Sequence, residues 1–167
     1  MSDSTITRDL RIRHRRLPHW QQGGSVYFVT FRSARGPLPS EALRMVAEAL
    51  RFGDSRHFTL HFAVLMPDHV HVLLQPLESS PGVWRNLSGI MKGASARRIN
   101  ILTGESGSVW RPESFDRIIR DQEEYLEKWN YMLNNPVKAG LVERPEDYEF
   151  TIAGDDPRDA TAREPER

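Results

Sequence analysis

The chain contains no cysteine among its 167 residues, so it can form neither a disulfide nor a thiolate metal site. It also has no apolar run that approaches the roughly 18 residues a membrane-spanning helix needs. Residues 1–17 are polar and arginine-rich and lack the apolar segment of a secretory signal. Together these absences predict a cytoplasmic protein, and the length suits one domain with a real core.

The chain also lacks an excess of either charge, since its formal net charge is zero, and this argues against a nucleic-acid partner. The distribution of the charges argues the other way. Residues 143–167 hold nine acidic and four basic residues, a net charge of −5, which leaves +5 on residues 1–142. A basic body with an acidic tail favours nucleic acid as a partner of the basic part.

Apolar periodicity predicts four strands and three helices. The strands are expected at residues 25–32, 57–65, 69–75 and 109–120, and the helices at residues 41–51, 82–102 and 121–135. The first six elements have the order of the split βαβ arrangement. The sequence therefore predicts an α+β, ferredoxin-like antiparallel sheet with its first and third strands in the centre, plus a C-terminal helix.

Finer expectations concern the second strand and the last helix. In the second strand Phe58, Leu60, Phe62 and Val64 are expected on one face, with His61 on the other. The last helix is expected to begin at Asp121 as its N-cap and to stop at Asn134-Asn135-Pro136, because proline disfavours helix in the residue before it. The expected domains are a basic N-terminal arm at 1–24, a folded domain at 25–150 and a charged, disordered tail at 151–167.

The third strand carries the first functional signal. Met66-Pro67-Asp68 predicts a tight turn, after which His69 and His71 alternate with apolar residues. Imidazoles two residues apart on a strand point the same way, so they can share a metal ion. The alternative is that both are ordinary half-buried strand residues.

The last helix carries the second signal. Tyr131 and Asn135 are four residues apart, so their side chains share one face of the helix. Tyr125 precedes Tyr131 by six residues and lies about 240° round the helix, on a different face. Tyr131 can therefore stand beside a metal that Asn135 helps to hold. A phenol is a poor nucleophile unless activated, and a divalent cation on a target phosphate would offset this.

Basic residues suggest where a nucleic acid could bind. The predicted second helix has several cations and almost no acid, which is typical of a phosphate-facing surface. The alternative is a solvated helix face or, for the arm, a solvated tail. The candidate DNA-binding residues are Arg15 and Arg16 in the arm, Arg85, Lys92, Arg97 and Arg98 in the second helix, and Arg111 after the flexible loop at 104–108.

Two runs of sequence resemble known signatures. Residues 66–74, Met-Pro-Asp-His-Val-His-Val-Leu-Leu, resemble the His-hydrophobe-His motif of HUH nucleases. Residues 131–141, Tyr-Met-Leu-Asn-Asn-Pro-Val-Lys-Ala-Gly-Leu, resemble the Tyr-x-x-x-Asn-Pro-Val-x-x-Gly-Leu signature of REP-associated tyrosine transposases, relatives of the insertion-sequence-200-like transposases. Further similarities extend the resemblance over residues 15–150: Arg15-Arg16 to Tyr27–Thr30, Lys92-Gly93 with Asn100, Trp110, and Phe115–Arg120.

The resemblance implies a metal-dependent endonuclease and strand transferase that cleaves and rejoins single-stranded DNA beside hairpins formed by REP-like palindromes. His69, His71 and Asn135 would hold Mg²⁺ or Mn²⁺, and Mn²⁺ suits imidazole ligands better. Tyr131 would attack the phosphate, leaving a 5′-phosphotyrosine and a free 3′-hydroxyl. The protein would act as a monomer or a homodimer, with Tyr131 working in its own chain or across the dimer. The alternative is a domesticated ferredoxin-like module that binds structured DNA or RNA without cutting it.

Overall fold

The computed structural model describes residues 24–77 and 83–154, with the backbone alone at residues 83–88. Residues 1–23, which make up almost all of the expected basic arm, and residues 155–167 of the expected tail lie outside the described residues. Arg15 and Arg16 therefore stay predictions. In the part of the chain that is described, no helix is both long enough and apolar enough to cross a membrane.

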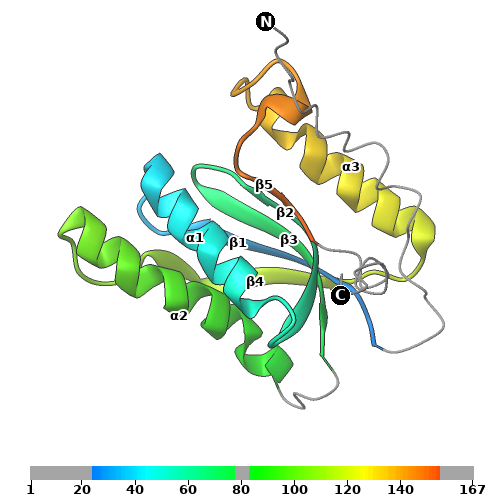
Figure 1. Cartoon of the computed structure of the whole chain (residues 1–167), viewed down its shortest axis with the longest axis horizontal. Coiled ribbons are helices and arrows are strands. Elements are labelled where there is room, and N and C mark those ends of the chain that lie inside the picture. Colours follow the sequence, from blue (N-terminus) through cyan, green and yellow to red (C-terminus); the bar gives the residue numbers. More distant parts are fainter. Residues whose placement is uncertain (1–23, 78–82, 155–167) are drawn as a thin grey trace, which may run out of the picture.

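All strand pairs in the five-stranded sheet are antiparallel, in the order β4-β1-β3-β2-β5. The elements along the chain are β1 (Tyr27–Ser33), α1 (Ser40–Gly53), β2 (Phe58–Leu65), β3 (His69–Pro76), α2 (Val83–Thr103), β4 (Trp110–Ile118), α3 (Gln122–Lys138), the short 3-10 helix η2 (Pro145–Asp147) and β5 (Thr151–Ala153) (Figure 1). The first six elements confirm the ferredoxin-like prediction, with β1 and β3 in the interior of the sheet.

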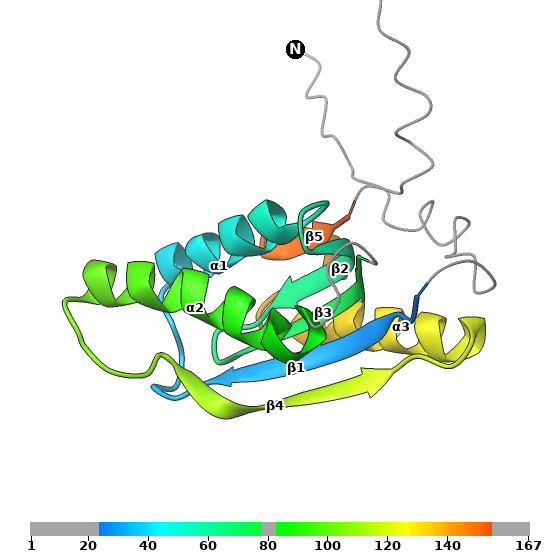
Figure 2. The same ribbon diagram turned by 90° about the horizontal axis from the view of Figure 1, so that it is seen from below.

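The sheet has helices on both faces. Helices α1 and α2 pack together over one face, and α3 lies across the other (Figures 1 and 2). Alternation along β3 divides its side chains between the two faces, because successive residues of a strand point to opposite sides. Val70, Val72 and Leu74 enter the core under α1 and α2, whereas Leu73 enters the core under α3.

The prediction that alternate residues of β2 share one face along the whole strand is wrong, because the alternation breaks in the middle of the strand. The register against β3 shifts between Leu60 and Phe62, which marks an irregularity at His61. Phe58 and Leu60 therefore lie in the core under α1 and α2, whereas Phe62 lies in the core under α3. An extra residue in one strand reverses the faces of all residues beyond it, and regular alternation cannot anticipate that.

Helix α3 begins as predicted but continues past its proline. The Asp121 side chain accepts a hydrogen bond from the backbone N–H of Glu124 at 2.8 Å, as expected of an N-cap. Pro136 lies inside the last turn, where its missing N–H costs a single intrahelical bond. The helix ends instead at Lys138, and the φ of 71° at Gly140 allows Leu141 N–H to bond the Pro136 carbonyl at 2.9 Å.

The predicted tail also begins too early. Residues 151–153 form β5, which pairs with β2 at the sheet edge, so the folded domain extends at least this far. Phe150 and Ile152 are buried in the core under α1 and α2. The charged composition of the flanking residues hid these two apolar anchors from the sequence pattern.

An ion-pair cluster holds the start of α3 against the edge of the sheet. Glu124 is buried, and its carboxylate accepts hydrogen bonds from the Arg117 side chain on β4 and from the backbone N–H and side chain of Arg120. The backbone hydrogen bond from Arg120 lowers the pKa of Glu124 from its ordinary value; burial opposes this, and the two arginine side chains add to the lowering.

We predict that Glu124→Gln lowers the free energy of unfolding at pH 7 by about 1–3 kcal/mol, because charge-assisted hydrogen bonds are lost. A depressed carboxyl pKa contributes stability above the unfolded pKa, so the difference from the unsubstituted protein should shrink as the pH falls below 4.5. Urea unfolding between pH 7 and pH 3 measures it. Glu123→Gln, an exposed first-turn neighbour, is the control and should show a small effect; equal losses in both variants would contradict the cluster's role.

Candidate active site

Strand β3 presents His69 and His71 on the face covered by α3, as the alternation predicts. Their rings lie 4.7 Å apart between centroids. In the register with β1, His71 is opposite Thr30 and His69 is opposite Arg32. His71 is only 3% exposed, and this burial lowers its pKa to about 3, with the neighbouring His69 and Arg32 charges adding to the effect. The His71 ring is therefore neutral at physiological pH.

The hydrogen bonds of His71 define which of its nitrogens carries the proton. Its Nε2 lies 3.0 Å from Nδ2 of Asn135, and an amide nitrogen can only donate, so Nε2 accepts. The proton then sits on Nδ1, which donates to Oγ1 of Thr30 at 2.7 Å. The lone pair on Nε2 faces α3, in the position from which a neutral imidazole binds a metal.

His69 has an oxygen partner of the same kind. Its Nδ1 lies 2.6 Å from Oδ1 of Asp68, the preceding residue. Partial burial raises the pKa of Asp68, but the hydrogen bond and charge of His69 outweigh it, and the net shift is downward. An ionised carboxylate only accepts, so Nδ1 of His69 donates and Nε2 is the remaining ring nitrogen. The sequence did not predict that Thr30 would contact His71, and it predicted only a turn role for Asp68. An acidic residue directly before the histidine pair could have indicated a hydrogen-bond partner for His69.

Helix α3 brings Tyr131 and Asn135 to the histidines and takes Tyr125 elsewhere. The Tyr131 ring lies 5.4 Å from the His71 ring and 6.3 Å from the Phe28 ring between centroids, and its side chain is 43% exposed. Tyr125 is buried and lies 3.2 Å from Nδ1 of His61 through its hydroxyl. The predicted separation of the two tyrosines onto different faces is confirmed.

The donor set fits a divalent metal. Among the described residues, no three His, Asp or Glu side chains converge on one point, so a metal bound by the two histidines would take any third protein ligand from another residue type. Asn135 is placed for that role, because rotating its amide by 180° would put Oδ1 where Nδ2 now contacts His71. Two imidazoles and an amide oxygen would suit Mn²⁺ better than Mg²⁺, and they would leave coordination positions open for a substrate.

The described cations of α2 that were predicted to contact DNA lie on the face away from the histidines. Helix α2 lies across the sheet from Tyr131, so Lys92, Arg97 and Arg98 are on the far side from the histidines (Figure 2). Lys92 donates to the carbonyls of Arg111, Pro112 and Glu113 at 2.9, 3.2 and 3.4 Å, at the irregular start of β4. Arg98 forms an ion pair with Glu48 at 2.6 Å.

Arg97 and Arg111 have exposed side chains, and the side chain of Arg85 lies outside the described residues. Of these candidates, Lys92 and Arg98 have the partners within the fold that are described above. DNA contact by all of these candidates stays a prediction.

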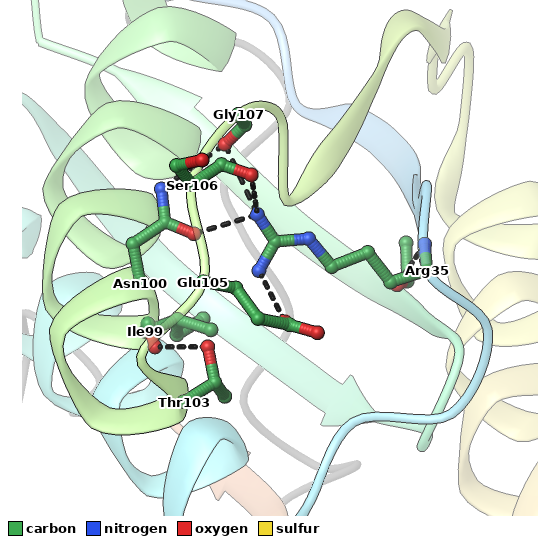
Figure 3. A network of polar contacts seen from close by, with 8 residues as sticks. Arg35, Ile99, Asn100, Thr103, Glu105, Ser106 and Gly107 are labelled. Atoms are coloured by element: carbon green, nitrogen blue, oxygen red, sulfur yellow. Dashed lines mark hydrogen bonds and ion pairs between the residues drawn. The ribbon is translucent and has the colours of Figure 1, made fainter.

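The loop at 104–108, expected to be flexible, is held by a single guanidinium group. Arg35 donates to Glu105 Oε2 at 2.8 Å and to Asn100 Oδ1 at 2.6 Å, and its Nη2 also reaches the carbonyls of Ser106 and Gly107 (Figure 3). Asn100 in turn donates to the Gly107 carbonyl at 3.0 Å. Two residues of the sequence resemblance, Lys92 and Asn100, therefore shape the backbone beside β4.

The fold and the paired histidines define the class: a ferredoxin-like α+β domain with a tyrosine on the helix that crosses the histidine face. No protein-family model matches the chain. The sequence is 24% identical over 138 residues to the REP-associated tyrosine transposase of Escherichia coli (strain K12), covering 80% of this chain and 78% of that protein.

Two solved structures share the fold. One is a REP-associated tyrosine transposase bound to a REP hairpin, with a TM-score of 0.60 and 21% identity over 88% of this chain and 87% of that one. The other is a candidate transposase from Deinococcus radiodurans R1, with a TM-score of 0.50 and 19% identity over 69% of this chain and 94% of that one. The resemblance to REP-associated tyrosine transposases, first seen in the motifs, is thereby confirmed.

We predict that Thr30→Val lowers the free energy of unfolding by about 1–3 kcal/mol, because the His71 Nδ1–H loses its acceptor in a buried setting. Thr30→Ser keeps the hydroxyl and should lose much less. Urea unfolding at pH 7 measures both. If the two variants are equally stable, Nδ1 of His71 does not depend on Oγ1, and the assignment of the ring proton is wrong.

Proposed function

We propose that the protein is a transposase that cleaves and rejoins single-stranded DNA next to hairpins, using Tyr131 as the nucleophile. One observation carries the proposal: Tyr131, His71 and Asn135 meet at one place although 60 positions in the sequence separate His71 from Tyr131. Similarity to a REP-associated tyrosine transposase, and to a structure of one with a REP hairpin, supports hairpin DNA as the substrate. A module that only binds DNA has no use for this grouping.

The proposed reaction is a transesterification by the Tyr131 phenol. The Tyr131 Oη would form a bond to the scissile phosphorus while the bond from phosphorus to the 3′ oxygen breaks. The phenol loses its proton, the 3′ oxygen gains one, and the products are a 5′-phosphotyrosine and a free 3′-hydroxyl. Because the phosphodiester is replaced by another ester, a 3′-hydroxyl can reverse the step without an external energy source.

His69, His71 and Asn135 would hold the divalent metal, which when bound would stabilise negative charge that develops on the phosphoryl oxygens. The protein's own contribution is orientation. Thr30 and Asp68 hold one nitrogen of each imidazole, so the other nitrogen of each is directed to the ligand position. Tyr131 stays partly exposed, which lets a polymer substrate approach from solvent. All these residues come from one chain, so a single chain can assemble the complete site.

We predict that Tyr131→Phe abolishes the covalent DNA adduct while hairpin affinity changes by less than about twofold, because only the nucleophilic oxygen is removed. Denaturing gels of labelled hairpin oligonucleotides with single-stranded flanks measure the adduct. Tyr125→Phe is the matched control and should keep adduct formation, since its hydroxyl faces His61 rather than the site. An adduct in the Tyr131 variant would place the nucleophile elsewhere.

We also predict that His69→Ala and His71→Ala each weaken Mn²⁺ binding by at least tenfold and remove metal-dependent cleavage, because each deletes a ligand. Mn²⁺ titration followed by electron paramagnetic resonance measures binding without DNA. His57→Ala, outside the site, is the control and should bind as the unsubstituted protein does. Undiminished Mn²⁺ binding in the double variant His69→Ala/His71→Ala would reduce the pair to a packing role.

A further inference from the structure

We propose that the exposed ring of Phe115 is a stacking platform for an unpaired base that flanks the phosphate attacked by Tyr131. The inference rests on the proposed function and adds to it a residue that positions the substrate. Phe115 lies on β4, the edge strand next to β1, and is 58% exposed. It belongs to neither core, so packing in the protein interior does not account for an aromatic residue at this position.

The register places Phe115 in line with the candidate active site. Phe115 is opposite Thr30 on β1, and Thr30 is opposite His71 on β3, so all three share one cross-strand row on the face that α3 partly covers. Neighbouring strands are about 4.8 Å apart, so the Phe115 backbone lies roughly 10 Å from that of His71. The start of α3 is anchored to Arg117 of β4, and beyond it the helix packs on Phe62 of β2 and reaches His71 of β3, while Phe115 stays exposed.

Ring contacts connect this position to the tyrosine. The Phe28 ring, on the same face, lies 6.3 Å from the Phe115 ring and 6.3 Å from the Tyr131 ring between centroids, and both contacts are edge-on. Phe28 thus contacts both rings. More than half of the Phe115 side chain remains exposed near the phenol that would attack the phosphate.

Charge on the same face suits a nucleic-acid strand. Arg32, opposite His69, is exposed, and Lys138 lies with its Nζ 5.8 Å from the Tyr131 ring. Among the described residues neither has an acidic partner within ion-pair distance. Asp116 points to the opposite face, since it pairs with Val29 of the core under α1 and α2. Two cations beside the candidate site and an exposed aromatic ring on the same face are the elements of a single-strand binding surface.

The chemistry favours an unpaired base over duplex DNA. Bases in a duplex are stacked on one another and offer only their edges, whereas an unpaired base offers a π-face that can lie on an aromatic ring. The proposed substrate has such bases where the strand leaves the hairpin. Stacking of this kind tolerates any base, so it would hold the strand without reading its sequence.

The test compares Phe115→Ala with Phe52→Ala, a matched control on α1 whose ring is 62% exposed and lies outside this face. The probes are a hairpin with single-stranded flanks of mixed sequence and the same hairpin without flanks. Phe115→Ala should weaken binding of the flanked hairpin by about 5- to 100-fold, the range of a lost base–aromatic stack, and leave the other hairpin unchanged. Phe115→Trp should keep the affinity.

A second readout locates the base. Flanked hairpins that carry 2-aminopurine at one flank position at a time should show fluorescence quenching at one or two positions, and Phe115→Ala should abolish it there. Unchanged affinity and quenching in Phe115→Ala would overturn the inference, as would equal losses for Phe52→Ala or for the hairpin without flanks. Thermal unfolding of each variant confirms that the fold is kept.

The covalent adduct is scored separately, so the two proposals can fail independently. If the unsubstituted protein forms the adduct but Phe115→Ala binds normally, the stacking inference fails and the proposed function stands. If flank binding depends on Phe115 but no adduct forms, the proposed nuclease activity fails and the single-strand surface stands. A peptide or duplex that competes for the surface better than single-stranded DNA would overturn the choice of ligand.

Discussion

The docking of α3 on the histidine face is the constraint on which the candidate site depends. Glu124 anchors the start of the helix to β4, Trp129 stacks on Phe62 with ring centroids 4.0 Å apart, and Asn135 reaches His71 near the end. Contacts at three levels fix both the position and the rotation of a helix. This rotation sets one tyrosine beside the histidines and buries the other in the core, so the chemistry of the site follows from how the helix packs.

The candidate site combines a buried histidine with an exposed tyrosine. His71 is neutral because burial makes its charged form costly, and a neutral imidazole is the form that binds a metal. The Nδ1 of each histidine has an oxygen partner in the fold, which orients the ring before any ligand arrives. Tyr131 stands at the border between these groups and solvent. The arrangement suits a long polymer that must present one phosphate without entering the interior.

The two faces of the sheet differ in role. The face under α1 and α2 holds the larger core. On this face Lys92 of α2 binds backbone carbonyls at the irregular start of β4, and Arg98 of α2 pairs with Glu48 of α1. The other face is only partly covered, and its open side carries Phe115 and Arg32. Strand β4 links the two roles, because its start is shaped by α2 while its middle borders the site.

The sequence by itself determined the order of elements, the shared face of His69 and His71, and the separation of Tyr131 from Tyr125, because alternation and helical periodicity are local properties. It did not reveal the irregularity at His61, the continuation of α3 through Pro136 or the pairing of residues 151–153 with β2. The first and third depend on strand partners elsewhere in the chain, and in the second the helix tolerates the proline because it removes only one hydrogen bond. Only the tertiary structure could decide that Lys92 binds carbonyls and that Thr30 holds His71, since both contacts join residues brought together by folding.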